Sequence, residues 1–388
     1  MGVFLKRRTF RRRSSVRRRG VAALGRLVGG DVETFFGRYW ERRPLLVARK
    51  KRKLLPFELT FSAAELLEIW KRSGKNTLVM REQTPVTEVS YAAYLDGCSV
   101  IVNHAEVASF EIGKFCRSLR STCPHAFGQL YATPPLGQAV GPHADDRDVF
   151  VVQLVGEKTW TVYRERPVRF PETHEQVGKT MPFPENFLDT CPSDTYLLKE
   201  GDVLYVPRGF VHEAETLQEA SVHLTVALAT QNWTYEKLLP PSKSRHSCDF
   251  ALLRPALRST KGRQRAMANF KNAVEGRPSL QDYHDLRRTF HDAVKHQNAH
   301  QDLAIAQLAA AKNNKAPRFV VRRETTPQEN RALVAREALA EALPRALSAI
   351  TAEERTAIDE LPDAPGFDII SKYAFAHACV DIGLLDFA

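Results

Sequence analysis

The sequence predicts an α+β protein in which a β-rich region precedes a helical one. Between about residues 77 and 232 the chain contains short runs rich in β-branched and aromatic residues, such as "AFGQLYAT" and "SVHLTVAL", separated by Pro, Gly and Asp. This density of short strands indicates a sandwich or a partly closed barrel. From about residue 250, stretches such as "RQRAMANFKNAVEG" have a helical character. A chain of 388 residues is also long enough for two or three domains.

Two helices are expected before the β-rich region. "DVETFFGRYWERRPLLV" reads as a short amphipathic helix followed by a strand after Pro44. "FSAAELLEIWKRSG" has Ser62 as the N-cap residue, Glu65 three residues later and Gly74 beyond its end. This spacing is typical of a capping box and of a glycine stop, so a helix is expected between these residues.

The C-terminal part is expected to hold a strand at "PRFVV" and helices at about 328–349 and 366–384. Helices combined with a small strand are compatible with a winged-helix-like unit. The helices after residue 250 carry apolar stripes, as in "FKNAVEG" and "LAIAQLAAA", which exceed what packing on a barrel needs. We therefore expect a homodimer formed through these helices.

The net charge of +11 is concentrated at the N-terminus. Residues 1–53 contain 18 Lys or Arg and three acidic residues, a net charge of +15, so the rest of the chain carries −4. The first 20 residues lack acidic side chains and are expected to be disordered. Such a segment is either attracted to RNA or to the ribosome surface, or is a solvated tail without a specific partner.

The cysteine pattern and the hydropathy exclude several classes of protein. The six cysteines are scattered, with no CxxC pair and no secretory signal. This indicates free thiols in a reducing compartment, so a cytoplasmic location is expected, and it argues against a disulfide framework or a zinc ribbon. No apolar run approaches the roughly 18 residues that span a bilayer.

The stretch "GPHADDRDVFVVQLVGEKTW", residues 141–160, places a histidine and an aspartate before an apolar run. His143 and Asp145 are two residues apart, so on a strand both side chains project from one face. We expect this strand to continue through Val149 to Val152, an apolar run typical of a strand covered on both faces. A carboxylate in such surroundings is costly unless it is paired or bound to a metal ion.

A third candidate ligand follows in "GDVLYVPRGFVHEAET", residues 201–216. Here a strand with a turn at each end leads to His212, and in a barrel this hairpin can bring His212 back to His143 and Asp145. Two imidazoles and one carboxylate form the triad of non-haem Fe(II) oxygenases, which leaves metal positions open for other ligands. A structural zinc site is more often closed by four ligands, including thiolates. The alternative interpretation is a structural His–Asp pair at the start of a strand.

These stretches, together with the preceding "FGQLYATPPLGQAV" and the later "SVHLTVAL", resemble the cupin-like JmjC ribosomal oxygenases. "FFGRYWERRPLLV" is similar to the N-terminal signature of the same family. The resemblance covers roughly residues 30–232, and beyond them only the order of elements is similar. It implies a double-stranded β-helix (jelly-roll) barrel, then a helical dimerisation domain and a small winged-helix-like domain. The implied division is a basic tail at 1–24, a JmjC/cupin catalytic domain at 25–235, a dimerisation domain at 236–316 and a winged-helix-like domain at 317–388.

The resemblance implies that His143, Asp145 and His212 are the catalytic ligands of Fe(II). It also implies that Lys158 binds the far carboxylate of the cosubstrate 2-oxoglutarate, since a dicarboxylate that leaves water needs a fixed cation. The alternative for Lys158 is an ordinary hairpin lysine, although sharing a strand face with Trp160 favours an inward position.

Other cosubstrate contacts follow from the resemblance with two departures. Tyr131 and Gln129 match positions that contact the cosubstrate, but the family tends to have Asn in place of Gln129 and Ser in place of Ala227. The pose of the cosubstrate is therefore less well defined by the sequence than the metal ligands. His223 alternates with apolar neighbours, and we expect it to be a packed, hydrogen-bonded residue and not a ligand.

The resemblance implies an Fe(II)- and 2-oxoglutarate-dependent dioxygenase that hydroxylates a side chain of a protein, expected to be a ribosomal protein. Demethylation, which begins with the same hydrogen abstraction, stays open. So do two other functions: a tailoring hydroxylase of a peptide natural product, and a non-catalytic ribosome- or nucleic-acid-binding protein that keeps the barrel as a scaffold.

Overall fold

The protein is described by a computed structural model that defines residues 23–49, 61–87, 91–120, 123, 125–230, 234, 292, 294–311, 316–323 and 335–388. The expected disorder of the first 20 residues lies outside the described residues. So do most of the expected dimerisation helices, including "FKNAVEG".

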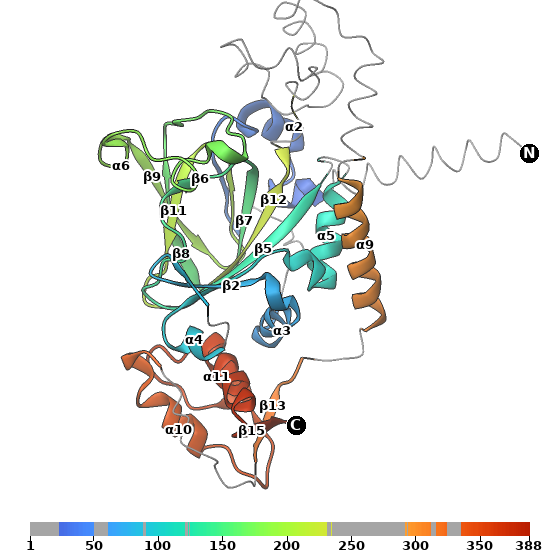
Figure 1. The fold of residues 1–388 in the computed structure, drawn as a ribbon, viewed down its shortest axis with the longest axis vertical. Helices are drawn as coiled ribbons and strands as arrows, with labels where there is room; N and C mark the ends of the chain where they lie inside the picture. Colours follow the sequence, from blue (N-terminus) through green and yellow to red (C-terminus); the bar gives the residue numbers. More distant parts are fainter. Residues whose placement is uncertain are drawn as a thin grey trace, which may run out of the picture.

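Two antiparallel sheets face each other and form the β-rich body of the molecule (Figure 1). The larger sheet has, in spatial order, β1 (Leu45–Val47), β10 (Val203–Val206), β7 (Asp148–Val155), β12 (Ser221–Leu228), β5 (Ala126–Thr133), β4 (Ser99–Val102), β2 (Thr77–Arg81) and β3 (Thr84–Val86). The smaller sheet has β6 (His143–Ala144), β11 (Val211–Glu215), β8 (Glu157–Tyr163) and β9 (Ser193–Lys199). The expected run of short strands is confirmed.

The space between the two sheets is an apolar core at one end and a polar pocket at the other. Phe127 and Val151 of the larger sheet pack against Trp160 and Leu198 of the smaller one. The central strand β12 is buried at every position, because the small sheet covers one face and helices cover the other.

Helices cover the outer face of the larger sheet (Figure 1). They are α3 (Ala63–Ser73), α4 (Tyr91–Leu95) and α5 (Phe110–Leu119). The predicted start of α3 is confirmed, since the Ser62 hydroxyl and the Glu65 carboxylate form a capping box. The helix ends at Gly74, which has a positive φ of 49°. Shorter helical turns are η4 (Gly74–Asn76), η5 (Ala105–Val107), η6 (Thr173–Glu175) and α6 (Phe187–Thr190).

The C-terminal residues form a separate layer below the helices of the barrel (Figure 1). It contains β13 (Phe319–Arg322), β14 (Thr356–Ala357), β15 (Leu385–Phe387), η10 (Glu337–Leu339), α10 (Ala342–Ser348), η11 (Ile358–Glu360) and α11 (Ile369–Asp381). The strands form a small sheet of their own, and α11 packs against α3 and α4. The winged-helix assignment stays a prediction.

Helix α9 (Lys295–Ala310) is the described part of the expected dimerisation region, and it packs along α5 (Figure 1). Gln301 on α9 is buried, and its amide donates to the carbonyl of Ala126 at 3.0 Å. Ala304 and Ile305 of α9 are also buried, and Ile305 lies next to Gly113 of α5, so part of the apolar surface of α9 is used against the barrel.

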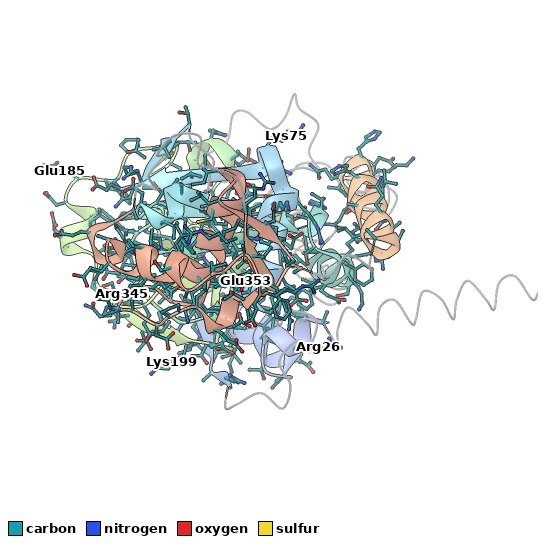
Figure 2. The ribbon with its side chains drawn as sticks, turned by 90° about the horizontal axis from the view of Figure 1, so that it is seen from below. Arg26, Lys75, Glu185, Lys199, Arg345 and Glu353 are labelled. Carbon is teal, nitrogen blue, oxygen red and sulfur yellow. The ribbon has the colours of Figure 1, made fainter. Side chains whose placement is uncertain are left out.

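Charged side chains such as Lys75, Glu185 and Lys199 are exposed and lie at the outline of the molecule (Figure 2). None of the helices in the described ranges is long and apolar enough to cross a membrane.

The N-terminal segment is joined to the barrel by a buried ion pair. α2 (Val32–Thr34) and η1 (Phe35–Tyr39) form the expected short helical segment, and β1 is the strand after Pro44. Directly after η1, Glu41 accepts hydrogen bonds from Arg208 Nε at 3.0 Å and Nη2 at 2.8 Å. Arg208 is 1% exposed and Glu41 is 4% exposed. Arg208 lies in the turn between β10 and β11, so this pair fixes the turn that leads to His212.

Replacing Arg208 with Met should destabilise the protein by about 3–5 kcal/mol, because Glu41 would stay buried without its cation. The control is Arg164→Met, which removes an ion pair with Asp194 whose side chains are 60% and 44% exposed. That substitution should cost less than about 1 kcal/mol. The measurement is urea-induced unfolding followed by circular dichroism. Equal shifts for the two variants would show that the Arg208–Glu41 pair does not hold the N-terminal segment.

Candidate metal centre

His143 and Asp145 converge because the chain crosses from one sheet to the other between them. The expectation that both lie on a strand continuing to Val152 is wrong. β6 ends at Ala144 in the smaller sheet, whereas β7 begins at Asp148 in the larger sheet. Asp145 lies in the connection, where its carbonyl accepts from the backbone N–H of Gly209 at 2.9 Å. The carboxylate is therefore positioned by the crossover and not by the alternation of a strand.

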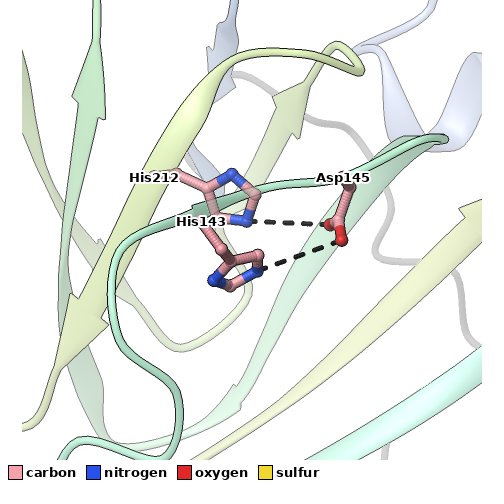
Figure 3. Close-up of side chains that lie close together, drawn as sticks. All are labelled: His143, Asp145 and His212. Atoms are coloured by element: carbon pink, nitrogen blue, oxygen red, sulfur yellow. Dashed lines mark ion pairs between the residues drawn. The ribbon is translucent and has the colours of Figure 1, made fainter. Parts of the chain in front are cut away.

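His212 lies directly opposite His143 on the paired strands β11 and β6. The ring centroids of the two histidines are 4.4 Å apart. Asp145 Oδ1 is 3.9 Å from His143 Nε2, and Asp145 Oδ2 is 3.7 Å from His212 Nε2 (Figure 3). One ligand atom from each residue lies within 4.8 Å of the other two. A single metal ion can contact all three.

Backbone carbonyls orient both imidazoles for metal binding. The Nδ1 of His143 lies 2.7 Å from the carbonyl of Gly141, and the Nδ1 of His212 lies 3.0 Å from the carbonyl of Phe210. A carbonyl only accepts, so each Nδ1 carries the proton. Each Nε2 then has its lone pair directed towards the centre of the triad.

The protonation states of the triad suit a metal ion. Burial lowers the pKa of His143 well below its usual value, and the charge of Lys179 lowers it further. Burial also lowers the pKa of His212. Burial opposes ionisation of Asp145, but the charge of Lys179 and the hydrogen bond that it donates favour the carboxylate, and the pKa of Asp145 lies below its usual range. Neutral imidazoles and an ionised carboxylate are the forms that bind metals.

A pocket of about 490 Å³, partly open to solvent, adjoins the triad. The residues around it come from both sheets and are Gln129, Tyr131, Ala139, Val140, His143, Asp145, Val149, Val151, Lys158, Trp160, His212, Glu213, Ala214, His223 and Thr225. The triad therefore opens onto a space between the sheets.

Lys158 points into this pocket and is buried, which supports the inward position expected from its strand phase. The side chain comes from β8, is 1% exposed and donates to the Thr133 hydroxyl at 2.9 Å. No carboxylate among the described residues pairs with it, and burial lowers the pKa of Lys158 to about 7. A buried ammonium without a counter-ion is unfavourable in the free protein and creates a site for an anion.

Two further polar atoms of the pocket lack partners. Trp160 Nε1 and His223 Nδ1 are buried, and neither finds a hydrogen-bond partner in the described part of the chain. The expectation that His223 is hydrogen-bonded is thus wrong for Nδ1, although the ring is packed. It stacks on Tyr131 with centroids 4.6 Å apart. The pocket offers unsatisfied polar groups to a ligand.

Gln129 lines the pocket with its amide bonded to a neighbouring residue, whereas Ala227 lies in the apolar core. The Gln129 amide, one methylene longer than Asn, donates to Asn103 Oδ1 at 2.7 Å. Ala227 is fully buried in the apolar core between the sheets and provides no hydrogen-bond donor side chain.

Two residues that contact the site, Thr133 and Lys179, were not identified from the sequence. Thr133 could have been found, because Gln129, Tyr131 and Thr133 alternate along β5 and share the inward face. Lys179, whose ammonium is 2.6 Å from Asp145 Oδ1, comes from a turn without periodicity, and only the preceding Gly178 hints at a close approach.

The donor set fits a divalent transition metal. Two imidazole nitrogens and one carboxylate oxygen suit Fe(II), and three ligands leave coordination positions open. The group contains no thiolate, which a structural zinc site commonly includes.

Comparisons with known proteins find a matching family model and several similar proteins. Residues 102–237 match a family model described as a JmjC domain. Ribosomal oxygenase 2 of Mus musculus is 31% identical over 247 residues, which is 59% of this chain and 51% of the mouse protein. Ribosomal oxygenase 1 of Danio rerio is 29% identical over 219 residues, which is 52% of this chain and 39% of the fish protein.

The match thus spans about half or less of the length of these curated relatives. Among solved structures, the ribosomal oxygenase YcfD of Escherichia coli is 17% identical, with 92% of this chain and 98% of that chain covered and a TM-score of 0.38. The resemblance predicted from the sequence is confirmed by the family match and by the curated relatives. Residues 102–237 match a JmjC domain, and the chain is similar to the ribosomal oxygenases over 52–59% of its length.

Proposed function

We propose that this protein is an Fe(II)- and 2-oxoglutarate-dependent dioxygenase that hydroxylates a side chain of a ribosomal protein. One observation carries the proposal: the pocket lined by the three metal-binding side chains is also lined by a buried lysine, Lys158, with which no carboxylate among the described residues pairs. 2-Oxoglutarate has a carboxylate at each end, so one end suits the metal and the other suits Lys158.

Each residue has a defined task in this proposal. The metal ion held by His143, Asp145 and His212 would supply the activation of O2. Lys158 binds the far carboxylate, and the free N–H of Trp160 offers a further donor in the same pocket. Such fixed donors hold the cosubstrate in one orientation.

The ribosomal substrate is proposed from the relatives and from the charge distribution. Both relatives described above are ribosomal oxygenases by name. The N-terminal 53 residues carry +15, which supports attraction to rRNA phosphates. The remaining chain carries −4 and tolerates a basic segment of a ribosomal protein near the pocket. We further propose a cytoplasmic homodimer in which the basic tail assists encounter and not chemistry.

Incubation with ribosomal proteins, Fe(II) and 2-oxoglutarate should add one oxygen to one of them and release succinate. Asp145→Ala and His212→Ala should each abolish this product, because loss of one of three protein ligands disrupts the metal site. His174→Ala, at an exposed histidine, is the control. Intact-mass spectrometry is the measurement.

A mass gain in a small peptide but in no ribosomal protein would support a tailoring hydroxylase instead. Loss of a methyl group would indicate demethylation. Undiminished product from Asp145→Ala would contradict the triad.

Lys158→Met should abolish 2-oxoglutarate binding and at the same time raise the melting temperature of the ligand-free protein. Because the folded-state pKa of about 7 lies below the usual 10.5, the penalty for burying the ammonium is complete below pH 7 and declines as the pH rises. The gain in stability should therefore be largest below pH 7. Lys158→Arg should retain weaker binding, since the cation is kept but its fork fits imperfectly. Calorimetric titration and thermal melts measure both effects. If Lys158→Met binds 2-oxoglutarate as tightly as the wild type does, Lys158 is an ordinary structural lysine.

Binding of 2-oxoglutarate to the metal-loaded protein should take up a proton above pH 7. Lys158 is then largely neutral in the free protein, and an anion beside it favours the protonated form. The affinity should fall by up to about tenfold per pH unit above pH 7. Titrations at pH 8 in two buffers of different ionisation enthalpy measure the proton uptake. An affinity that does not change between pH 7 and 9 would argue against a direct contact.

A further inference from the structure

A lysine that the proposed reaction does not use lies directly on one of the metal ligands. Lys179 Nζ is 2.6 Å from Asp145 Oδ1, within ion-pair and hydrogen-bond distance. The Lys179 side chain is 35% exposed, whereas that of Asp145 is 16% exposed. The ammonium therefore approaches the carboxylate from the solvent side.

The turn that carries Lys179 is fixed against the strand of the triad. The backbone N–H of Ala144 donates to the carbonyl of Val177 at 2.8 Å. Gly178 has a φ of +81°, and a Cβ atom there would lie 2.4 Å from the carbonyl oxygen of Pro142. The backbone thus approaches β6 as closely as a glycine allows, which holds Lys179 beside the metal ligands.

A second set of contacts ties the same turn to the connection that contains Asp145. Gln176 is buried, and its carbonyl accepts from the backbone N–H of Lys179 at 3.0 Å, while its side-chain amide donates to the carbonyl of Thr173 at 2.9 Å. The Thr173 hydroxyl donates to Asp146 Oδ2 at 2.8 Å. Lys179 and Asp145 are therefore positioned by one connected set of hydrogen bonds.

The charges of the triad make this contact consequential. Asp145 is the acidic member of the triad, and its carboxylate is the group that Lys179 contacts. The ammonium of Lys179 therefore compensates the charge of this carboxylate. A buried carboxylate is costly without a compensating charge, and Lys179 provides that charge in the metal-free protein.

We propose that Lys179 is a resident counter-ion of Asp145 that competes with the divalent metal ion for this carboxylate. This inference rests on the metal site of the proposed function. Lys179 Nζ lies 2.6 Å from Asp145 Oδ1, so an ion bound to this carboxylate would lie close to the ammonium. Repulsion between the two cations, or the cost of moving the lysine into solvent, would lower the affinity for the metal.

The test is calorimetric titration of Mn(II) into the full-length protein after removal of metals with a chelator. Lys179→Met removes the charge while keeping an unbranched side chain, and it should bind Mn(II) about tenfold more tightly than the wild type. Lys179→Arg keeps the charge and should bind as the wild type does. If the Met variant folds poorly by circular dichroism, Lys179→Gln makes the same comparison.

Lys199→Met is the matched control, because Lys199 is a 68% exposed lysine paired with Glu157 on β8 and β9 (Figure 2). It should leave the affinity for Mn(II) unchanged. If the neutral Lys179 variants bind Mn(II) as tightly as the wild type, Lys179 has no effect on metal binding. If they bind Mn(II) more weakly, Lys179 orients Asp145 for the metal. Either result would overturn the inference. If the wild type binds no Mn(II), or if Asp145→Ala binds Mn(II) as tightly as the wild type does, the metal site of the proposed function fails as well. The two failures are thus distinguishable.

Discussion

The pairing of β6 with β11 is the constraint on which the site depends. β6 is only two residues long, and its register against β11 places His143 opposite His212. A shift by one residue would turn one imidazole away from the other, because strand side chains alternate between faces. The buried Arg208–Glu41 pair and the contact of Gly209 with Asp145 hold the turn before β11 in place. The N-terminal segment therefore contributes to the site without touching it.

The pocket contains buried polar groups that lack either an ion-pair partner or a hydrogen-bond partner among the described residues. Lys158 is buried without an anion, and Trp160 Nε1 and His223 Nδ1 lack partners among the described residues. Folded proteins usually pair such groups, so leaving them unpaired lowers stability and favours a ligand that completes them. Asp145 differs, because Lys179 already compensates its charge. The two charged groups of the pocket thus differ. Lys158 has room for an anionic ligand, whereas a metal ion at Asp145 would compete with the ammonium of Lys179.

The sequence predicts much of this arrangement where the physics is local. Strands β5 and β12 coincide with the apolar runs, and α3 begins and ends at the predicted cap residues. The triad was predictable from ligand chemistry and from the hairpin before His212. The crossover at Asp145 was not, because no residue pattern tells a continuous strand from one that changes sheets. The contact of Lys179 with Asp145 could not be predicted either, because it depends on how a turn packs against β6. The missing partner of His223 also depends on tertiary packing, which alternation alone does not reveal.

We propose that one pocket holds a metal at His143, Asp145 and His212 and a dicarboxylate at Lys158. Anomalous diffraction from crystals grown with Mn(II) and 2-oxoglutarate can locate both ligands at once. We expect an anomalous peak between the three ligand atoms and density for a carboxylate within hydrogen-bond distance of Lys158 Nζ. A peak elsewhere, or a ligand whose carboxylates both lie away from Lys158, would contradict it.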